Sequence, residues 1–182
     1  MRLKTALCAL LGACALLAAA GCGGESGDAN TGASAPAATA AKKQAGPLPE
    51  NGYKAQVEVI DPPARLKAGE KTILQVKVKN ISDAQWYARG GEVNTNPGNQ
   101  FFLAVGDRWL KPDGQTLITD MDGRRGLERD LKPGEEEVVP LQINALKEPG
   151  DYVLEVDMIQ EQVTFFRQKG SAPAKYKVTV TR

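Results

Sequence analysis

The sequence predicts an all-β protein whose folded part is a sandwich of two antiparallel β-sheets. Apolar residues alternate with polar residues in short runs, which is the period of a half-buried strand. Clusters of Gly, Pro, Asn and Asp separate these runs, and no segment has the periodicity of a helix. Seven to nine short strands over roughly 130 residues, from Asn51 to Arg182, are typical of a β-sandwich.

The first two predicted strands show the alternation most clearly. Every second residue is apolar in each, so one face is expected to enter the core. The expected core residues are Ala55, Val57 and Val59 in the first strand and Leu74, Val76 and Val78 in the second. The first strand ends at Asp61-Pro62-Pro63, and Gln56, Glu58 and Ile60 occupy its other face.

The later predicted strands are separated by two long loops, residues 88–99 and 120–133. The strands are expected at 100–105, 107–110, 116–118, 137–143, 152–159 and 163–166, followed by a last strand in which Tyr176, Val178 and Val180 alternate with polar residues. Turn residues Lys111-Pro112-Asp113-Gly114 join the second of these strands to the third.

One run resembles the tyrosine corner of immunoglobulin domains. In Pro149-Gly150-Asp151-Tyr152, the tyrosine lies near the start of a late strand, two residues before Leu154, which stands where a disulfide Cys would be. Trp86 follows an early core strand and resembles the buried Trp of strand C. The resemblance implies an immunoglobulin-like topology in which the Tyr152 hydroxyl bonds back to the main chain.

Residues 51–182 as a whole resemble an immunoglobulin- or fibronectin-III-like domain of bacterial surface proteins. Similar modules are appended to surface-polysaccharide glycosyltransferases. The features that carry the resemblance are Asn80 to Trp86, Trp109 to Gly114, Asp122-Gly123-Arg124, Leu131 to Glu135, Pro149 to Tyr152, Glu161 and Phe165-Phe166. Such steps recur in many β-sandwiches, so the resemblance implies a fold more than a function.

Residues 1–21 have the organisation of a signal peptide. Arg2 and Lys4 precede an apolar run, residues 6–20, that is shorter than the about 20 residues needed to span a membrane. The following Ala19-Ala20-Gly21-Cys22 resembles a bacterial lipobox, with Ala19 where Leu is commoner.

This resemblance implies that Cys22 takes a diacylglyceryl thioether, becomes the mature N-terminus and is N-acylated. Gly23 after the cysteine implies the outer membrane of a Gram-negative cell, facing the periplasm or the surface. Cleavage by an ordinary signal peptidase is the alternative, because Ala18-Ala19-Ala20 also satisfies its small-residue rule.

Residues 22–50 form the predicted lipidated N-terminus and a flexible, disordered linker. The segment is rich in Gly, Ala, Ser, Thr and Pro and has no apolar period, so it cannot bury enough surface to offset its chain entropy. Its removal up to Glu50 is therefore expected to leave the stability of the domain unchanged.

Composition excludes several classes of function. The sequence has no His, and its three Cys are Cys8, Cys14 and Cys22, so the mature chain has no disulfide, no Ser-His-Asp triad and no His-ligated metal. Without Arg2 and Lys4 the mature chain keeps 21 basic and 22 acidic residues. Its net charge is therefore near −1, and it lacks the basic excess that nucleic-acid-binding proteins show. No cofactor or metal is expected.

Aromatic pairs are the candidate binding residues. Neighbouring strand residues point to opposite faces, so at most one Phe of each pair can enter the core. The candidates for an exposed aromatic patch are Phe101, Phe102, Trp109, Phe165 and Phe166. The alternative is that the two long loops cover them.

Two carboxylate patterns are weaker candidates. Glu155 and Asp157 share a strand face near Glu161, which could suit an acid/base pair, although such a face is usually solvated and paired with Lys or Arg. Asp120-Met121-Asp122-Gly123 resembles a fragment of a calcium loop but lacks its distal Glu.

The sequence therefore predicts a membrane-anchored lipoprotein whose sandwich is a non-catalytic binding or scaffold module. Its expected partners are the bilayer, through acylated Cys22, and an envelope protein or polysaccharide. A carbohydrate-binding module is the second hypothesis and an enzyme the third. A flat aromatic strip would favour sugar, and a compact apolar patch would favour a protein.

Overall fold

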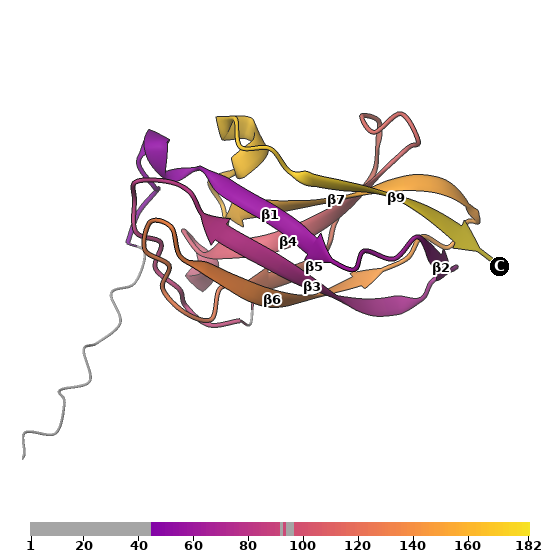
Figure 1. Ribbon diagram of the computed structural model, residues 1–182, viewed down its shortest axis with the longest axis horizontal. Coiled ribbons are helices and arrows are strands. Elements are labelled where there is room, and N and C mark those ends of the chain that lie inside the picture. The colour runs from indigo at the N-terminus through magenta and orange to yellow at the C-terminus, as the bar shows by residue number, and fades with distance from the viewer. Residues whose placement is uncertain (1–44, 92, 94–96) are drawn as a thin grey trace, which may run out of the picture. The chain divides into compact units, whose positions relative to one another are not determined.

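The computed structural model describes residues 45–91, 93 and 97–182. Within them the chain forms nine strands and three short 3-10 helices (Figure 1). The strands are β1 (Ala55–Ile60), β2 (Arg65–Lys67), β3 (Lys71–Asn80), β4 (Leu103–Leu110), β5 (Leu117–Gly126), β6 (Glu136–Asn144), β7 (Gly150–Gln160), β8 (Thr164–Phe165) and β9 (Ala174–Thr181). The 3-10 helices are η1 (Glu50–Gly52), η2 (Pro97–Asn99) and η3 (Phe166–Lys169).

Two sheets form the predicted sandwich. One has the order β1-β3-β6, and the other has the order β2-β9-β7-β4-β5 with β8 beside β7. The chain visits the larger sheet briefly with β2 and returns for β3. It then crosses to β4 and β5, returns for β6 and crosses again to β7, an order like that of immunoglobulin domains. One detail differs from the prediction of a purely antiparallel fold, because β2 pairs with β9 in parallel.

The alternation predicted for β1, β3 and β6 is confirmed. Val59 of β1 is buried, Val57 is half-buried, and the predicted inward residues of β3 and β6 line the core. The buried residues of these two strands are Leu74, Val76 and Val78 of β3 and Val139, Leu141 and Ile143 of β6.

The larger sheet departs from the sequence prediction at β4 and β5. Residues 100–105 and 107–110 were expected as two strands, but β4 is continuous through Gly106. Because both of its faces are covered, it shows no alternation. The loop expected at 120–133 is wrong in its first part, since β5 extends to Gly126. β4 is the one strand that pairs with β5, so β5 is an edge strand and carries no clear apolar pattern.

The tyrosine corner is confirmed. The Tyr152 hydroxyl donates a hydrogen bond of 3.0 Å to the carbonyl oxygen of Glu148, and its ring meets Trp109 edge to face at 6.3 Å between centroids. Leu154 is fully buried. The assignment of Trp86 to strand C is wrong, because it lies in the connection between β3 and β4, and Trp109 on β4 holds the strand position.

Trp86 instead belongs to an aromatic cluster at one end of the sandwich. Phe166 packs edge to face against both Tyr53 and Trp86, at 5.2 Å and 5.3 Å between ring centroids. The indole N–H of Trp86 donates to the carbonyl of Gly52 at 2.9 Å. This cluster joins the segment before β1 to the segment after β8.

The folded domain begins before Asn51. Leu48 is buried in the core, and its backbone N–H donates to Oε1 of Gln160 at 3.0 Å. The same oxygen accepts a 2.6 Å bond from the Tyr53 hydroxyl, and Nε2 of Gln160 donates to the carbonyl of Gly46 at 3.2 Å. The boundary placed at residue 50 is therefore too late, because a single Leu in a Pro- and Gly-rich context has no periodicity to reveal it. No helix in the described residues is long and apolar enough to cross a membrane.

A chain that begins at Asn51 should be less stable than one that begins at Ala45. It loses the burial of Leu48 and leaves Oε1 of Gln160 with fewer donors, which together cost about 3 kcal/mol. Urea unfolding of both chains measures the difference. Equal midpoints and slopes would mean that residues 45–50 contribute nothing to the core.

Candidate functional site

The aromatic residues singled out from the sequence do not share an exposed face. Trp109 and Phe166 are fully buried, and Phe102 is buried beside Arg89, whose guanidinium lies 5.0 Å from the centre of its ring. Arg89 also donates to the carbonyls of Gly98 and Gln100, so the connection between β3 and β4 covers this ring. Three of the five candidates therefore cannot belong to an exposed patch.

The two remaining aromatic residues, Phe101 and Phe165, are half-buried. Phe165 is stacked under the guanidinium of Arg167, 3.8 Å from the ring centre. Phe101 has a left-handed backbone, with φ of 69°, and its carbonyl accepts a bond from Nε2 of Gln160. One Phe of each pair is buried, Phe102 and Phe166, but neither pair lies wholly within a strand, so strand alternation is not the reason.

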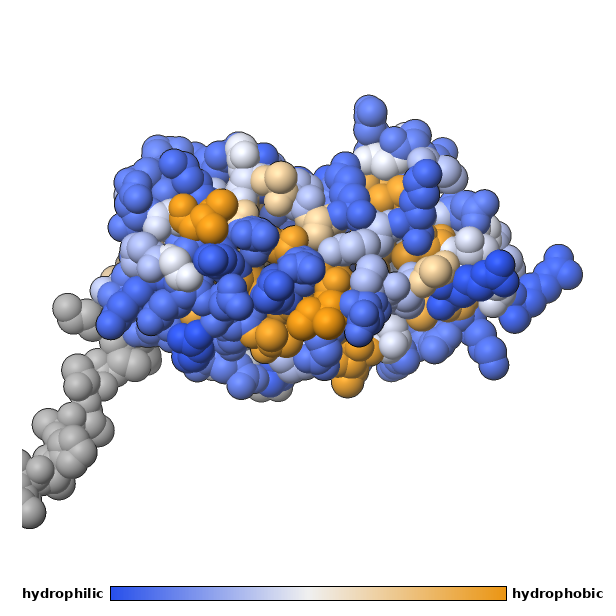
Figure 2. Space-filling view, in the orientation of Figure 1, coloured by the Kyte–Doolittle hydropathy of each residue, from blue (hydrophilic) through white to orange (hydrophobic). Residues whose placement is uncertain are grey.

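The exposed large apolar side chains of the described residues are all aliphatic. They are Ile60, Ile73, Ile81, Leu117, Ile118, Val138 and Val163. Three of these, Ile60, Ile73 and Val138, point outward from the three-stranded sheet, where Ile73 is 60% exposed. Figure 2 shows hydrophobic surface across the middle of the side of the domain on which these strands lie.

Strand register brings Ile60 and Ile73 together beside Pro140, around the exposed Gln75, whereas Val138 lies further along, opposite Lys77. Ile60 lies opposite Gln75, which in turn lies opposite Pro140 of β6. Ile73 is two residues along the strand from Gln75 and so neighbours both Ile60 and Pro140 diagonally. We call Ile60, Ile73, Val138 and Pro140 the aliphatic face.

Charged residues border the aliphatic face at one end. Glu58 and Lys77 form an ion pair of 2.7 Å, and Lys79 lies opposite Glu136 in the register. At the other end, Lys71 lies two residues before Ile73 on the same side of β3. The Glu58–Lys77 pair lies level with Val138, so the face combines exposed aliphatic side chains with charged ones, as protein–protein interfaces do.

The sequence carries one signal for this face. Ile60 and Ile73 occupy outward positions of their strands, where the other residues are Gln, Glu and Lys. They are apolar where the alternation calls for a polar residue. Because single exposed aliphatic residues are ordinary, only the register across three strands reveals that they gather.

The carboxylates of β7 are buried rather than solvated. Glu155 and Asp157 point away from the core of the sandwich, yet both are covered by basic side chains. Oε1 of Glu155 lies 2.5 Å from Nε of Arg108 and its Oε2 lies 3.2 Å from Nζ of Lys175. Asp157 accepts from both the backbone N–H and the guanidinium of Arg167, each at 3.2 Å.

This arrangement ties η3 to the sheet and covers Glu155 and Asp157. Glu161, the third candidate, pairs with Arg124 instead of joining the other two. Burial raises the pKa of Asp157 to about 6, against the smaller effect of Arg167, which lowers it. The ion pairs therefore hold the basic side chains of β4, β9 and η3 against the outer face of β7.

The candidate calcium segment is part of a strand. Residues 120–123 lie within β5, and the backbone N–H of Gly123 donates to Oδ1 of Asp107. A Cβ on Gly123 would lie 2.0 Å from the carbonyl oxygen of Gln142, so Gly123 permits β5 to touch β6. Among the described residues no group of three or more His, Cys, Asp or Glu side chains is placed to hold a metal ion.

Comparisons with known proteins find likeness only at the level of solved structures. No protein-family model matches the chain, and no curated protein matches it. A solution structure of a CARDB domain from Pyrococcus furiosus is 16% identical, with a TM-score of 0.41, covering 70% of this chain and 94% of that one. A crystal structure of the same domain in complex with di-metal ions is also similar, at a TM-score of 0.39.

A beta-glucosidase from Listeria innocua in complex with glucose is similar over a small part of its length. It is 18% identical with a TM-score of 0.42, and the match covers 71% of this chain but 16% of the enzyme. Likeness at this level adds nothing to the fold that the strand order already defines.

Replacement of Asp157 by Asn should change how stability depends on pH. The pKa of Asp157 is raised from 3.8 to about 6 on folding, so its contribution is fully present below about pH 4 and is lost as pH rises through 6. Asp157→Asn should therefore be as stable as the wild type or more stable at about pH 7.5, by at most about 3 kcal/mol. The difference should shrink toward pH 5, as measured by denaturant unfolding at each pH.

Asp113→Asn is the matched control. The pKa of Asp113 is lowered to about 2 by bonds from Thr116, so this carboxylate is charged in both states across the same pH range. Its replacement should shift stability by a constant amount between pH 5 and about pH 8. If Asp157→Asn were the less stable chain at pH 7.5, the ion pair with Arg167 would outweigh the cost of burial.

Proposed function

We propose that this chain is a membrane-anchored lipoprotein whose β-sandwich is a non-catalytic module that docks a protein partner in the cell envelope. The anchoring rests on the sequence, since Cys22 follows a signal peptide and a lipobox-like run. Several acyl chains, each worth about 0.8 kcal/mol per buried CH₂, would hold the chain stably at the bilayer. Gly23 favours the outer membrane as the destination.

The observation that carries the docking role is the contrast between buried aromatic and exposed aliphatic residues. Sugar-binding surfaces present aromatic rings to the flat faces of the ligand, and here Trp109, Phe166 and Phe102 are inside. The aliphatic face instead presents exposed aliphatic side chains together with charged ones, which suits another protein. Carbohydrate binding is therefore the less favoured reading.

An enzymatic role has less support than a docking role. Glu155 and Asp157 are covered by Arg108, Arg167 and Lys175, and their positions let them hold the sheet together rather than transfer protons to a substrate. A module of this kind would act by position, so the linker length and the anchor would set where its docking surface can reach.

Photo-cross-linking in living cells tests both parts of the proposal. A chain with Ile73 replaced by benzoylphenylalanine should form an adduct with a protein, and the adduct should fractionate with the membrane. The same replacement at Lys177, which is exposed on β9 of the larger sheet, is the matched control and should give none. Adding Cys22→Ala should remove metabolic acyl labelling and move the protein to the soluble periplasmic fraction.

Each part can fail separately. Adducts that resist protease but yield to polysaccharide-degrading enzymes would replace the protein partner with a glycan. A Cys22→Ala chain that stays in the membrane fraction would contradict lipid anchoring, whatever the cross-link shows.

A further inference from the structure

Two adjoining hollows lie beside the tyrosine corner, at one end of the aliphatic face. The first, of about 530 Å³, is lined by Lys111, Ile118, Leu146, Lys147, Glu148 and Tyr152. The second, of about 470 Å³, shares Leu146 and Lys147 and extends to Lys71. We call Lys71, Lys111, Ile118, Leu146, Lys147 and Tyr152 the corner groove.

The apolar wall of the corner groove is held in place by hydrogen bonds and a ring contact. The Tyr152 ring is fixed by its bond to Glu148 and by its contact with Trp109, whose indole N–H donates to the carbonyl of Asn144 at 3.0 Å. The carbonyl of Leu146 accepts from the backbone N–H of Gly69 at 3.0 Å. Ile118 remains 41% exposed on this wall, so the groove is preformed and has apolar surface to offer.

The rim of the corner groove is basic. Lys71, Lys111 and Lys147 are exposed, and no acidic side chain of the described residues lies within ion-pair distance of any of them. Glu148 is the one carboxylate that lines either hollow. Three exposed lysines without an ion pair among the described residues, beside an apolar wall, are complementary to a ligand that is both acidic and apolar.

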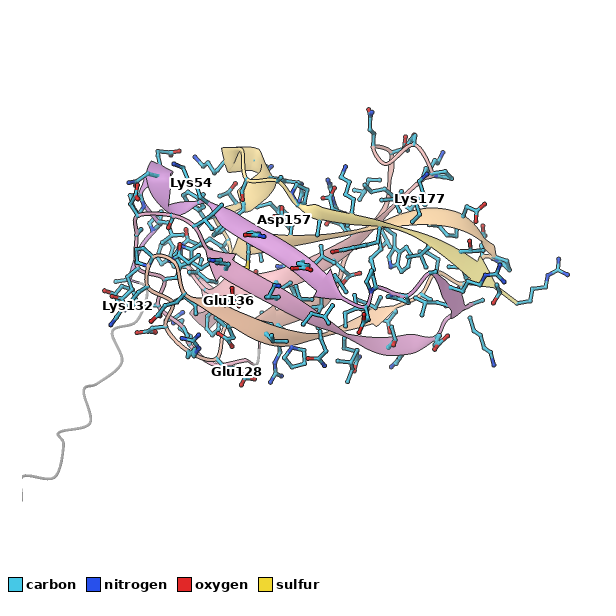
Figure 3. All side chains as sticks on the ribbon, in the orientation of Figure 1. Lys54, Glu128, Lys132, Glu136, Asp157 and Lys177 are labelled. Carbon is cyan, nitrogen blue, oxygen red and sulfur yellow. The ribbon has the colours of Figure 1, made fainter. Side chains whose placement is uncertain are left out.

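The groove lies at the end of the sandwich opposite to the point where the chain enters it. β7 has Tyr152 near its start and Gln160, which binds residues 46–53, at its end. Those eight residues of strand span roughly 25 Å. In Figure 3, Lys54 just after the incoming segment and Lys177, which lies opposite Val153 of β7, are likewise at separate ends of the domain.

We propose that the corner groove binds an acidic segment of a partner protein, with an apolar side chain of that segment against Ile118 and Tyr152 and its carboxylates on the three lysines. This inference rests on the proposed function. Lys71 lies next to the aliphatic face, so the partner docked on that face would also supply the acidic segment.

Fluorescence anisotropy with a defined peptide tests the assignment. The protein is the chain from residue 22 onward with Cys22→Ala, and the probe is a short fluorescein-labelled peptide in which Glu and Asp alternate with Leu. Lys111→Glu and Lys147→Glu should each weaken binding by about fivefold or more, since each loses an attraction and gains a repulsion. Ile118→Ser should weaken it similarly, whereas Lys54→Glu, with the same charge change at the other end, should change it less than about twofold.

Several outcomes would overturn the groove. An equal loss with Lys54→Glu would mean that the peptide responds only to net charge. Equal binding of a peptide in which Ser replaces the acidic residues would remove the role of the lysines. Tighter binding of phosphatidylglycerol vesicles, lost in Lys147→Glu, would assign the groove to a membrane. The Ile73 cross-link is independent of all three, so the groove can fail while the docking face stands.

Discussion

The rest of the structure depends on the burial of β7 on both of its faces. Its inner face carries the apolar residues Leu154, Val156 and Met158, and its edges are hydrogen-bonded to β4 and β9. Its outer face carries Glu155 and Asp157, and a buried carboxylate without a partner would cost several kcal/mol. The basic residues that cover them come from β4, β9 and η3, so the requirement to pair two carboxylates fixes three other elements.

The two ends of β7 connect this central strand to the proposed functions. At one end Gln160 binds the segment through which the chain enters the domain, and at the other Tyr152 forms a wall of the corner groove. A domain without disulfides can therefore separate a proposed anchoring end from a proposed docking end. The rigidity that this requires comes from packing and hydrogen bonds within one strand and its neighbours.

Sequence reasoning predicted the strands that bury one face in the core and expose the other face to water. The strands β1, β3, β6 and β9 alternate because their outer faces meet water, and the Pro-Gly-Asp-Tyr run predicted the corner. It could not predict β4 and β5, since the first is covered on both faces and the second is an edge strand with one partner. The aliphatic face and the corner groove were missed because each is assembled from residues far apart in the chain. The aromatic candidates were misjudged because pairs such as Phe165-Phe166 do not reveal which loops cover them.

Native-state hydrogen exchange tests the central place of β7 most directly. If the strand is the constraint on which the other elements depend, the amides of Leu154, Val156 and Met158 should exchange only through global unfolding. Their exchange free energy should equal that from denaturant unfolding, with the amides of β2 and β8 exchanging through smaller openings. If the amides of β3 and β6 stayed protected while those of β7 exchanged by local opening, the smaller sheet would be the stable unit and this account would be wrong.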